Sequence, residues 1–463
     1  MGHPGCMGQV RHLAQAGLPA QGELAAQGGG SGGAHGVLVE AGALVLLLLV
    51  LAFAVVRPRG LPEAVAAVPA AGAAVAFGAV SPQAAWAQTR QLLPVVGFLA
   101  AVLVLSRLCA DDGLFAAAGD VVARACRGSP RRMLAGVFAV ASLTTAVLSL
   151  DATVVLLTPV VFATARRVGA RPRPHVYATA HLANSASLLL PVSNLTNLLA
   201  FTASGLTFPR FAALLGPAWL LVVAVEYAVF RRFFRADLAT PTGAGRTGVD
   251  RAAGGVRTRT PVPVFTLVVL ALTLAGFVAA SLAGVAPAWA ALGGVLVLGA
   301  RSLARRRSTP AELVWSAGPL FCVFVLALGV LVEAVVSGGL AGGAARLLPA
   351  SAAGGYGLGA LLTIAAVAAV LANLVNNLPA TLALLPLVAR GGPGPVLAVL
   401  IGVNLGPNLT YVGSLATLLW RRILHEHGTD AELGRFTRLA LWTVPSTLAV
   451  ATTALWAMLR VLG

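Results

Sequence analysis

Polar residues interrupt four apolar stretches of the chain, and their types suit the binding of a small solute or ion. Asn, Ser and Thr offer neutral donors and acceptors together, and Gly and Pro allow a helix to stop. Unpaired backbone groups are costly in hydrocarbon, so such breaks persist only around a polar cavity or inside protein. The breaks are SLDAT (149–153), PVSNLTN (191–197), NLVNNLPAT (373–381) and YVGSLATL (411–418).

We predict that the four breaks meet and form one site for substrate and ion. Free helix N-termini carry partial positive charge and free carbonyls partial negative charge, which serves both kinds of ligand. Small polar residues also hold ordinary membrane helices together, and this remains the alternative for any single Ser or Thr. The predicted substrate- and ion-binding residues are Asp151, Thr153, Asn184, Ser193, Asn194, Thr196, Asn197, Asn376, Asn377, Asn404, Asn408, Thr410, Gly413, Ser414 and Thr417.

Asp151 is the only carboxylate at any of the four breaks. An ionisable group at membrane depth is a functional candidate, and binding a proton or cation would reduce the cost of burying its charge. Alternatively, Asp151 caps the helix that follows it. His181 either titrates as well or packs against a carbonyl. Glu40, Glu226 and Glu333 are expected to reach the membrane interface or to pair with Arg.

The composition indicates a polytopic α-helical protein of the cell membrane. Of the 463 residues, 58% are hydrophobic and 10% are charged, and the mean hydropathy is +0.89, whereas soluble domains carry about 25% charged residues. The net charge of +17 does not indicate nucleic acid, because all 32 basic residues are Arg in short loops between apolar runs. The sequence holds no P-loop, nucleophile–base motif or His/Glu metal cluster, so we expect no enzyme, metal or cofactor.

The apolar runs predict ten spans in two sets of five. Between the third and fourth span of each set, 133–166 and 355–390 read as hairpins that enter and leave by one face. The domains are expected to be a disordered tail (1–36), a first repeat (37–235), a cytoplasmic linker (236–261) and a second repeat (262–463). The spans fall at about 37–56, 61–79, 93–110, 175–201, 210–234, 263–283, 286–302, 313–336, 395–424 and 437–461.

The arginines predict the orientation. With both termini outside, 26 of the 32 lie on the inner face, as the positive-inside rule requires. The count does not distinguish a re-entrant hairpin from two full spans, since both return the chain to the same face.

The two sets of spans show matching residues. Asp151 and Asn377 lie 226 residues apart, and Asn184 and Asn404 lie 220 apart. Because five is odd, the second set enters the membrane with opposite orientation. We therefore predict an all-α fold of two inverted-topology repeats of five spans, each with a re-entrant hairpin and a broken helix, as in secondary transporters.

Four segments of the chain carry a family resemblance. LDATVVLLTP (150–159), LANSASLLLPVSNLTNLL (182–199), LANLVNNLPATLALLP (371–386) and NLGPNLTYVGSLATLLWRRIL (404–424) resemble the arsenite/antimonite permeases of the ArsB type, within the ion transporter superfamily. The resemblance covers about residues 37–463. It implies the same inverted-repeat fold and export of trivalent arsenic and antimony, coupled to proton entry or to a separate ATPase subunit.

The chain departs from that family at three site positions. Asn184 and Asn404 stand where the family commonly has Asp, and Asn408 where it often has Lys, which bears on proton coupling. Arsenite near neutral pH is mostly the uncharged trihydroxide, which amides and hydroxyls can bind without thiols. We expect an antiporter for this small inorganic oxyanion or neutral hydroxide, with a proton or sodium as coupling ion. The alternative is a sodium- or proton-coupled transporter of a small carboxylate or other anion.

Overall fold

The computed structural model describes residues 34–56, 61–239, 261–337, 357–410, 413–429 and 431–462, and all regular structure in these ranges is helical. The first half contains α2 (Ala34–Val56), α3 (Ala64–Ala76), α4 (Pro82–Asp111), α5 (Leu114–Ala125), α6 (Pro130–Val147), η2 (Ala152–Leu157), α7 (Thr158–Val168), α8 (Arg173–Ser185), η3 (Ala186–Leu189), η4 (Pro191–Ser193), α9 (Leu195–Ser204), α10 (Phe208–Phe233) and α11 (Arg235–Ala239). The second half contains α12 (Val264–Leu282), α13 (Ala288–Ala304), α14 (Pro310–Ser316), α15 (Pro319–Val335), α17 (Leu358–Val375), α18 (Asn377–Val388), η7 (Ala389–Gly391), α19 (Pro393–Leu405), η8 (Gly406–Leu409), α20 (Leu415–Glu426) and α21 (Leu433–Leu462).

Six helical segments in the described ranges are long and apolar enough to cross a membrane: α4, α10, α12, α14 with α15, α17 and α21. Five of them match predicted spans, and α17 is the sixth, although the sequence places it in a hairpin. The other five predicted spans match shorter apolar helices, two of which belong to broken spans. The multi-pass, all-helical class is thus confirmed, and the count of ten spans stays a prediction.

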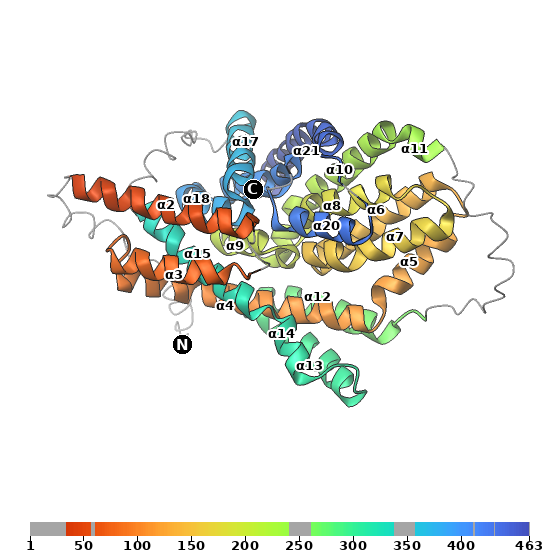
Figure 1. Cartoon of the computed structure of the whole chain (residues 1–463), viewed down its shortest axis with the longest axis horizontal. Coiled ribbons are helices and arrows are strands. Elements are labelled where there is room, and N and C mark those ends of the chain that lie inside the picture. The colour runs from red at the N-terminus through yellow and green to blue at the C-terminus, as the bar shows by residue number, and fades with distance from the viewer. Residues whose placement is uncertain are drawn as a thin grey trace, which may run out of the picture.

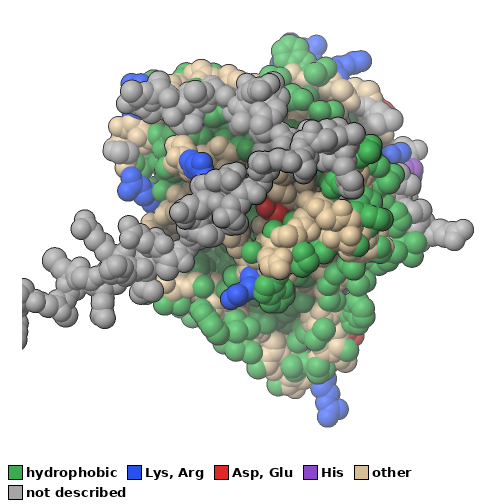
Figure 2. All heavy atoms as spheres, turned by 90° about the vertical axis from the view of Figure 1, so that its left-hand side faces the viewer, with side chains coloured by type: hydrophobic (Ala, Val, Ile, Leu, Met, Phe, Trp, Pro, Cys, Tyr) green, Lys and Arg blue, Asp and Glu red, His purple; other side chains and the backbone are tan. Residues whose placement is uncertain are grey.

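The outer surface suits a lipid environment. Leu272, Leu296 and Trp442 are 65%, 62% and 67% exposed, which would be unfavourable in water. One end of the molecule is covered mainly by hydrophobic side chains, with scattered Arg side chains (Figure 2). The apolar surface therefore supports the membrane assignment independently of helix length.

The second half repeats the order of elements of the first. A hairpin, a broken helix and a long helix follow one another twice, first as α6 with α7, α8 with α9, and α10, then as α17 with α18, α19 with α20, and α21. The long helices α10 and α21 pack against each other (Figure 1). The order agrees with two repeats, while their inverted orientation, the domain boundaries and the location of the termini stay predictions.

The first hairpin is broken between α6 and η2. The Ser149 hydroxyl accepts the backbone N–H of Ala152 at 3.1 Å, whereas the Asp151 side chain makes no capping hydrogen bond. Capping by Asp151 is therefore wrong, since its side chain accepts no backbone N–H of the helix that follows. The next six residues form a π-helix, a conformation that occurs frequently at functional sites.

The second hairpin is broken at Asn376, between α17 and α18. Its φ is 80°, a left-handed value that is uncommon for a residue other than Gly. The proline of this break, Pro379, lies in the first turn of α18, where a missing N–H costs no intrahelical bond. The reversal thus depends on Asn376.

Both predicted helix breaks are present. The chain is extended at Asn194 before α9, with φ −157° and ψ 151°. It is also extended at Ser414 before α20, with φ −146° and ψ 143°. The two residues are 220 positions apart, so the halves share backbone conformation as well as element order at this point.

The helix α19 crosses α17 with almost no space between their backbones. A Cβ on Gly402 would stand 2.3 Å from the Ala365 carbonyl oxygen, and one on Gly406 would stand 2.6 Å from the Ala369 Cα. Glycine at both positions therefore fixes the distance between the second hairpin and the second broken helix.

The start of the predicted linker is ordered. The helix α11 extends to Ala239, and its Asp237 pairs with Arg171 at 2.8 Å and with Arg435 of α21 at 3.1 Å. This buried carboxylate holds the first residues of the predicted linker against both halves, and the linker itself stays a prediction. The helix α2 likewise begins at Ala34, inside the predicted tail; residues 1–33 and 240–260 lie outside the described residues.

Candidate functional site

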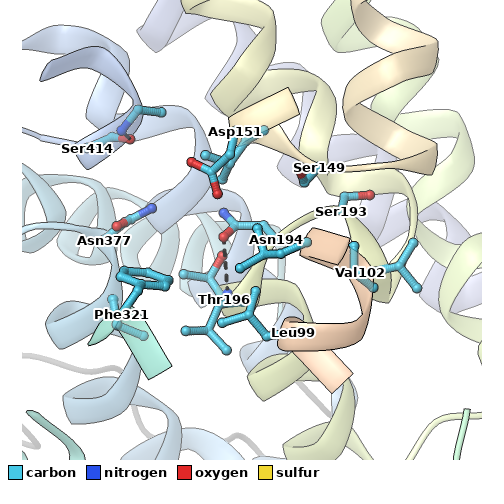
Figure 3. A pocket seen from close by; sticks show the side chains of 16 residues that line it. Leu99, Val102, Ser149, Asp151, Ser193, Asn194, Thr196, Phe321, Asn377 and Ser414 are labelled. Atoms are coloured by element: carbon cyan, nitrogen blue, oxygen red, sulfur yellow. Dashed lines mark hydrogen bonds between the residues drawn. The ribbon is translucent and has the colours of Figure 1, made fainter. Parts of the chain in front are cut away.

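One small cavity of about 60 Å³ is lined by residues from all four breaks. Asp151 comes from the first hairpin, Asn377 from the second, and Asn194 and Ser414 from the two broken helices (Figure 3). Its apolar wall includes Leu99 and Val102 of α4 and Phe321 of α15. The structure thus brings the breaks to one place, and their role in binding stays a prediction.

Four helical segments begin at this cavity, and each presents its N-terminus to it. They are η2 with α7, α9, α18 and α20. The first N–H groups of a helix lack partners inside it and carry partial positive charge. Asn194 accepts the Thr196 N–H at 3.4 Å, and Ser414 accepts the Ala416 N–H at 3.1 Å. The helix N-termini therefore bring hydrogen-bond donors and partial positive charge to the cavity.

Asp151 is the only charged side chain among the described residues that line the cavity. Its carboxylate points toward the space between Asn194 and Asn377 (Figure 3). Within the described ranges no side chain or N–H donates a hydrogen bond to it and no cation pairs with it. The carboxylate is thus available to a ligand.

A network of buried amides lies behind the cavity. Asn404 of α19 accepts from the Thr196 hydroxyl at 2.8 Å and from the Asn194 amide at 3.4 Å, and it donates to Asn197 at 2.6 Å. These bonds join the second broken helix to the first. A fully bonded buried network of this kind fixes one arrangement of its members.

The equivalent residue of the first half, Asn184, repeats one of these bonds. The Asn184 amide donates to Asn408 at 2.9 Å and to Thr417 at 3.4 Å. Asn184 and Asn404 lie 220 positions apart, and so do Asn197 and Thr417. The bond from Asn184 to Thr417 therefore corresponds to the bond from Asn404 to Asn197. The same hydrogen bond thus occurs twice, once in each direction between the halves.

Three other predicted residues take structural positions. The Thr153 hydroxyl bonds to that of Thr145 at 2.7 Å, and Ser193, although it lines the cavity, donates to the Ala146 carbonyl at 2.7 Å. Thr410 donates to Asn373 at 2.9 Å, away from the cavity lining. Their hydroxyls hold the breaks in shape.

Two more predicted residues serve the backbone. A Cβ on Gly413 would lie 2.7 Å from the Pro407 Cα, so only glycine fits there. Asn376 is buried and its side-chain oxygen has no hydrogen-bond partner in the described residues. Neither residue is among the described lining of the cavity.

The expectation for Glu226 is wrong. Glu226 is 1% exposed, forms no ion pair with an Arg among the described residues, and lies 3.7 Å from the His181 Nδ1. The sequence held a signal for this burial: Ala218, Val222 and Phe230 repeat every fourth residue in α10, and Glu226 continues their buried stripe. The apolar wall from α4 and α15 had no comparable signal, because its residues resemble any span.

Asn194→Ala and Ser414→Ala are each expected to lower transport at least about tenfold, since each removes a cavity-lining polar group. Each also loses a helix cap, which costs about 1 kcal/mol and leaves insertion intact. Transport in proteoliposomes and the amount of inserted protein are the measurements. Ser446→Ala is the control, because its hydroxyl bonds to the carbonyl of Trp442 in its own helix. Normal transport by both variants would make the breaks packing features.

Comparison with known proteins places the chain among membrane transporters. It is 26% identical over 414 residues to the arsenical pump membrane protein of Escherichia coli K12, covering 87% of this chain and 95% of that protein. It is also 26% identical over 379 residues to an uncharacterized transporter of Mycobacterium tuberculosis, covering 78% of this chain and 85% of that protein. Both similarities span the two halves of the chain.

A solved structure shows the same fold. The YdaH transporter of Alcanivorax borkumensis, described as having an unusual topology, superposes with a TM-score of 0.53 at 16% identity, over 81% of this chain and 87% of that one. The family described as citrate transporter, CitMHS, matches residues 44–404. This range includes both hairpins and the first broken helix. The chain therefore belongs to the CitMHS family and is a multi-pass membrane transporter.

Proposed function

We propose that this protein exports arsenite and antimonite across the cell membrane as a proton-coupled antiporter. The names of relatives such as the Escherichia coli arsenical pump membrane protein support this substrate class. The observation that carries the proposal is the cavity itself, a space of about 60 Å³ whose described lining includes one unpaired carboxylate and no basic side chain. Such a site suits a small neutral solute with hydrogen-bond donors.

Arsenious acid fits that description. Each of its three hydroxyls can donate and accept, as alcohols do. One would donate to the Asp151 carboxylate, and the others would bond to the amides of Asn194 and Asn377 or to free N–H groups of the helix N-termini. A hydrogen bond to a charged acceptor is about twice as strong as a neutral one, so Asp151 would provide the main attraction.

Citrate is the second candidate, because the family description names it and four helix N-termini favour an anion. Its charge argues against it here. The Asp151 carboxylate would repel a tricarboxylate, since no cationic side chain in the described lining offsets that charge.

Cells that lack their own arsenite exporter are expected to tolerate more arsenite, and to contain less arsenic, when they express this protein. The Asn194→Ala variant, expressed to the same level, is the matched control and should give no protection. Everted vesicles provide the direct measurement, since export from cells becomes uptake into vesicles. Unchanged arsenic content together with uptake of a carboxylate would replace the proposal with the second candidate.

A further inference from the structure

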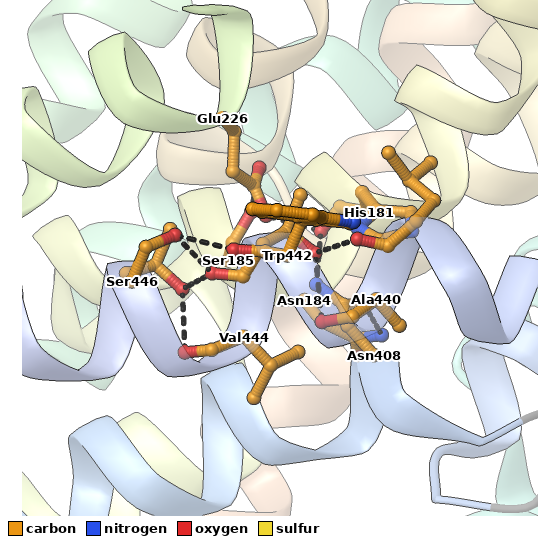
Figure 4. Close-up of polar contacts among 12 residues, drawn as sticks. His181, Asn184, Ser185, Glu226, Asn408, Ala440, Trp442, Val444 and Ser446 are labelled. Carbon is orange, nitrogen blue, oxygen red and sulfur yellow. Dashed lines mark hydrogen bonds and ion pairs between the residues drawn. The ribbon is translucent and has the colours of Figure 1, made fainter. Parts of the chain in front are cut away.

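A second polar cluster lies beside the amide network and outside the cavity lining. The His181 ring of α8 is fully buried, and its Nδ1 is 3.7 Å from Oε1 of Glu226 in α10. The Ser185 hydroxyl donates to the other carboxylate oxygen at 2.7 Å. Glu226 reaches into this cluster from its helix, with Asn184 and Asn408 on the far side of His181 (Figure 4).

The rest of the cluster's surroundings are apolar. The rings of Phe230 and Phe436 lie 5.2 and 5.1 Å from the His181 ring. Among the described residues, Glu226 is the only charged side chain that forms an ion pair with that ring. The nearby ionisable groups are engaged elsewhere: Tyr177 of α8 accepts from the Glu432 backbone, and Arg435 of α21 pairs with Asp237.

Two of the other helices that pack against α8 hold charged side chains in contacts of their own. On α7, Arg167 pairs with Asp120, and on α20, Arg422 pairs with Glu426. Burying a single charge away from water is very costly unless it is paired. With one proton the pair is neutral overall, either as acid and imidazole or as carboxylate and imidazolium. Release of that proton leaves a buried negative charge.

The Ser185 hydroxyl responds to where the proton lies. Its oxygen is within bonding distance of two acceptors, Glu226 Oε2 at 2.7 Å and the His181 carbonyl at 2.9 Å. A hydroxyl has one proton to donate. When Glu226 is ionised, that proton goes to the carboxylate; when Glu226 is protonated, the acid donates to Ser185, which then donates to the carbonyl.

The same carbonyl connects the cluster to the other half of the protein. The Asn408 amide of η8 donates to the His181 carbonyl at 3.1 Å, and the Asn408 oxygen accepts from Asn184 at 2.9 Å. When the His181 carbonyl also accepts from the Ser185 hydroxyl, its hydrogen bond with the Asn408 amide changes. The protonation state of Glu226 thus changes a contact between the first and second broken helices.

We propose that Glu226, His181 and Ser185 bind and release one proton in each transport cycle, at a site separate from the substrate cavity. The proposal rests on the proposed coupled transport. A ring nitrogen facing a single carboxylate suits a proton better than sodium, which prefers several oxygen ligands. In the predicted orientation this cluster lies near the cytoplasmic face, since Arg231 of that face follows Glu226 by five residues, about 8 Å along α10.

Glu226→Gln is expected to reduce by one the number of protons moved per substrate. In proteoliposomes with a clamped membrane potential, the steady arsenite accumulation ratio should fall about tenfold for each unit of pH gradient, since a unit of pH is a tenfold change in proton activity. Arsenite exchange without a gradient should keep its KM, because Glu226 does not line the cavity. Glu333→Gln, a half-buried carboxylate of α15, is the matched control and should leave both measurements unchanged.

A second measurement needs no transported substrate. Infrared spectra of the purified protein, titrated with pH, should contain a carboxyl band that Glu226→Gln removes and Asp151→Asn leaves in place. This readout keeps the proton site testable even if arsenite is not the substrate. If Glu226→Gln does not insert, Ser185→Ala replaces it and should shift the midpoint of that band. The proposal is overturned if Glu226→Gln moves as many protons per substrate as the wild type. It is also overturned if the carboxyl band is the same as in the wild type in both Glu226→Gln and Ser185→Ala.

Discussion

Asp151→Asn is expected to abolish most proton-driven accumulation of substrate while exchange without a gradient continues. In an antiporter, proton and substrate must exclude each other, and Asp151 is the one described lining residue that could bind either. Asn has nearly the same shape but cannot carry the proton. The accumulation ratio should therefore fall about tenfold per unit of pH gradient, which is the loss of one proton per cycle.

The same substitution should raise the KM for exchange about tenfold. A hydrogen bond to a charged group contributes about 1.5–3 kcal/mol, and an amide replaces it with a weaker neutral one. This increase in KM distinguishes Asp151 from Glu226, which touches no substrate in the proposed cycle. If Asp151→Asn accumulates substrate as the wild type does, with the wild-type KM, the carboxylate takes no part in binding or coupling.

Among the described glycines, Gly402→Ala is expected to have the largest effect on stability of any single added methyl group. The new Cβ would stand 2.3 Å from the Ala365 carbonyl oxygen, 2.6 Å from the Ala368 Cβ and 3.0 Å from the Ala369 nitrogen. Backbone atoms cannot turn aside as a flexible side chain does, so α17 and α19 must move apart. Overpacking of this kind costs about 3 kcal/mol, and the loss should appear as a lower unfolding temperature in detergent.

Gly293→Ala is the matched control in α13. A Cβ there would meet no atom within 4 Å, and alanine is more favourable than glycine inside a helix by about 0.5–1 kcal/mol. The control should therefore be as stable as the wild type or slightly more so. Equal unfolding temperatures for the two variants would show that the spacing of α17 and α19 is not fixed by Gly402.

The sequence predicts the breaks well because their causes are local. Hydrophobic runs give the helices, and Asn, Ser, Thr, Gly and Pro in those runs mark the interruptions at 149–153, 191–197, 373–381 and 411–418. The residue types alone do not show which residue caps the helix or reverses the chain at each break. Ser149 rather than Asp151 makes the cap, and Asn376 rather than Pro379 makes the second reversal.

Features made by distant segments were harder to predict. Glu226 and His181 belong to different helices, and nothing in a single helix says that α10 turns its carboxylate toward α8. The sequence alone could only have noted that Glu226 falls on the buried stripe of α10. The division of the fifteen predicted site residues into cavity lining, amide network and backbone support likewise depends on how four segments are oriented in space.

The amide network makes synthesis of the two halves interdependent. Asn184 finds its partner Asn408 only after 224 further residues have been made, which takes roughly 10–45 s at about 5–20 residues per second. Throughout that interval the Asn184 amide of the first half has neither of its partners, Asn408 and Thr417. The first half must stay open, hydrated or held by the insertion machinery until the second half arrives. Truncated chains that end before α19 are therefore expected to be recognised by membrane proteases as unfinished.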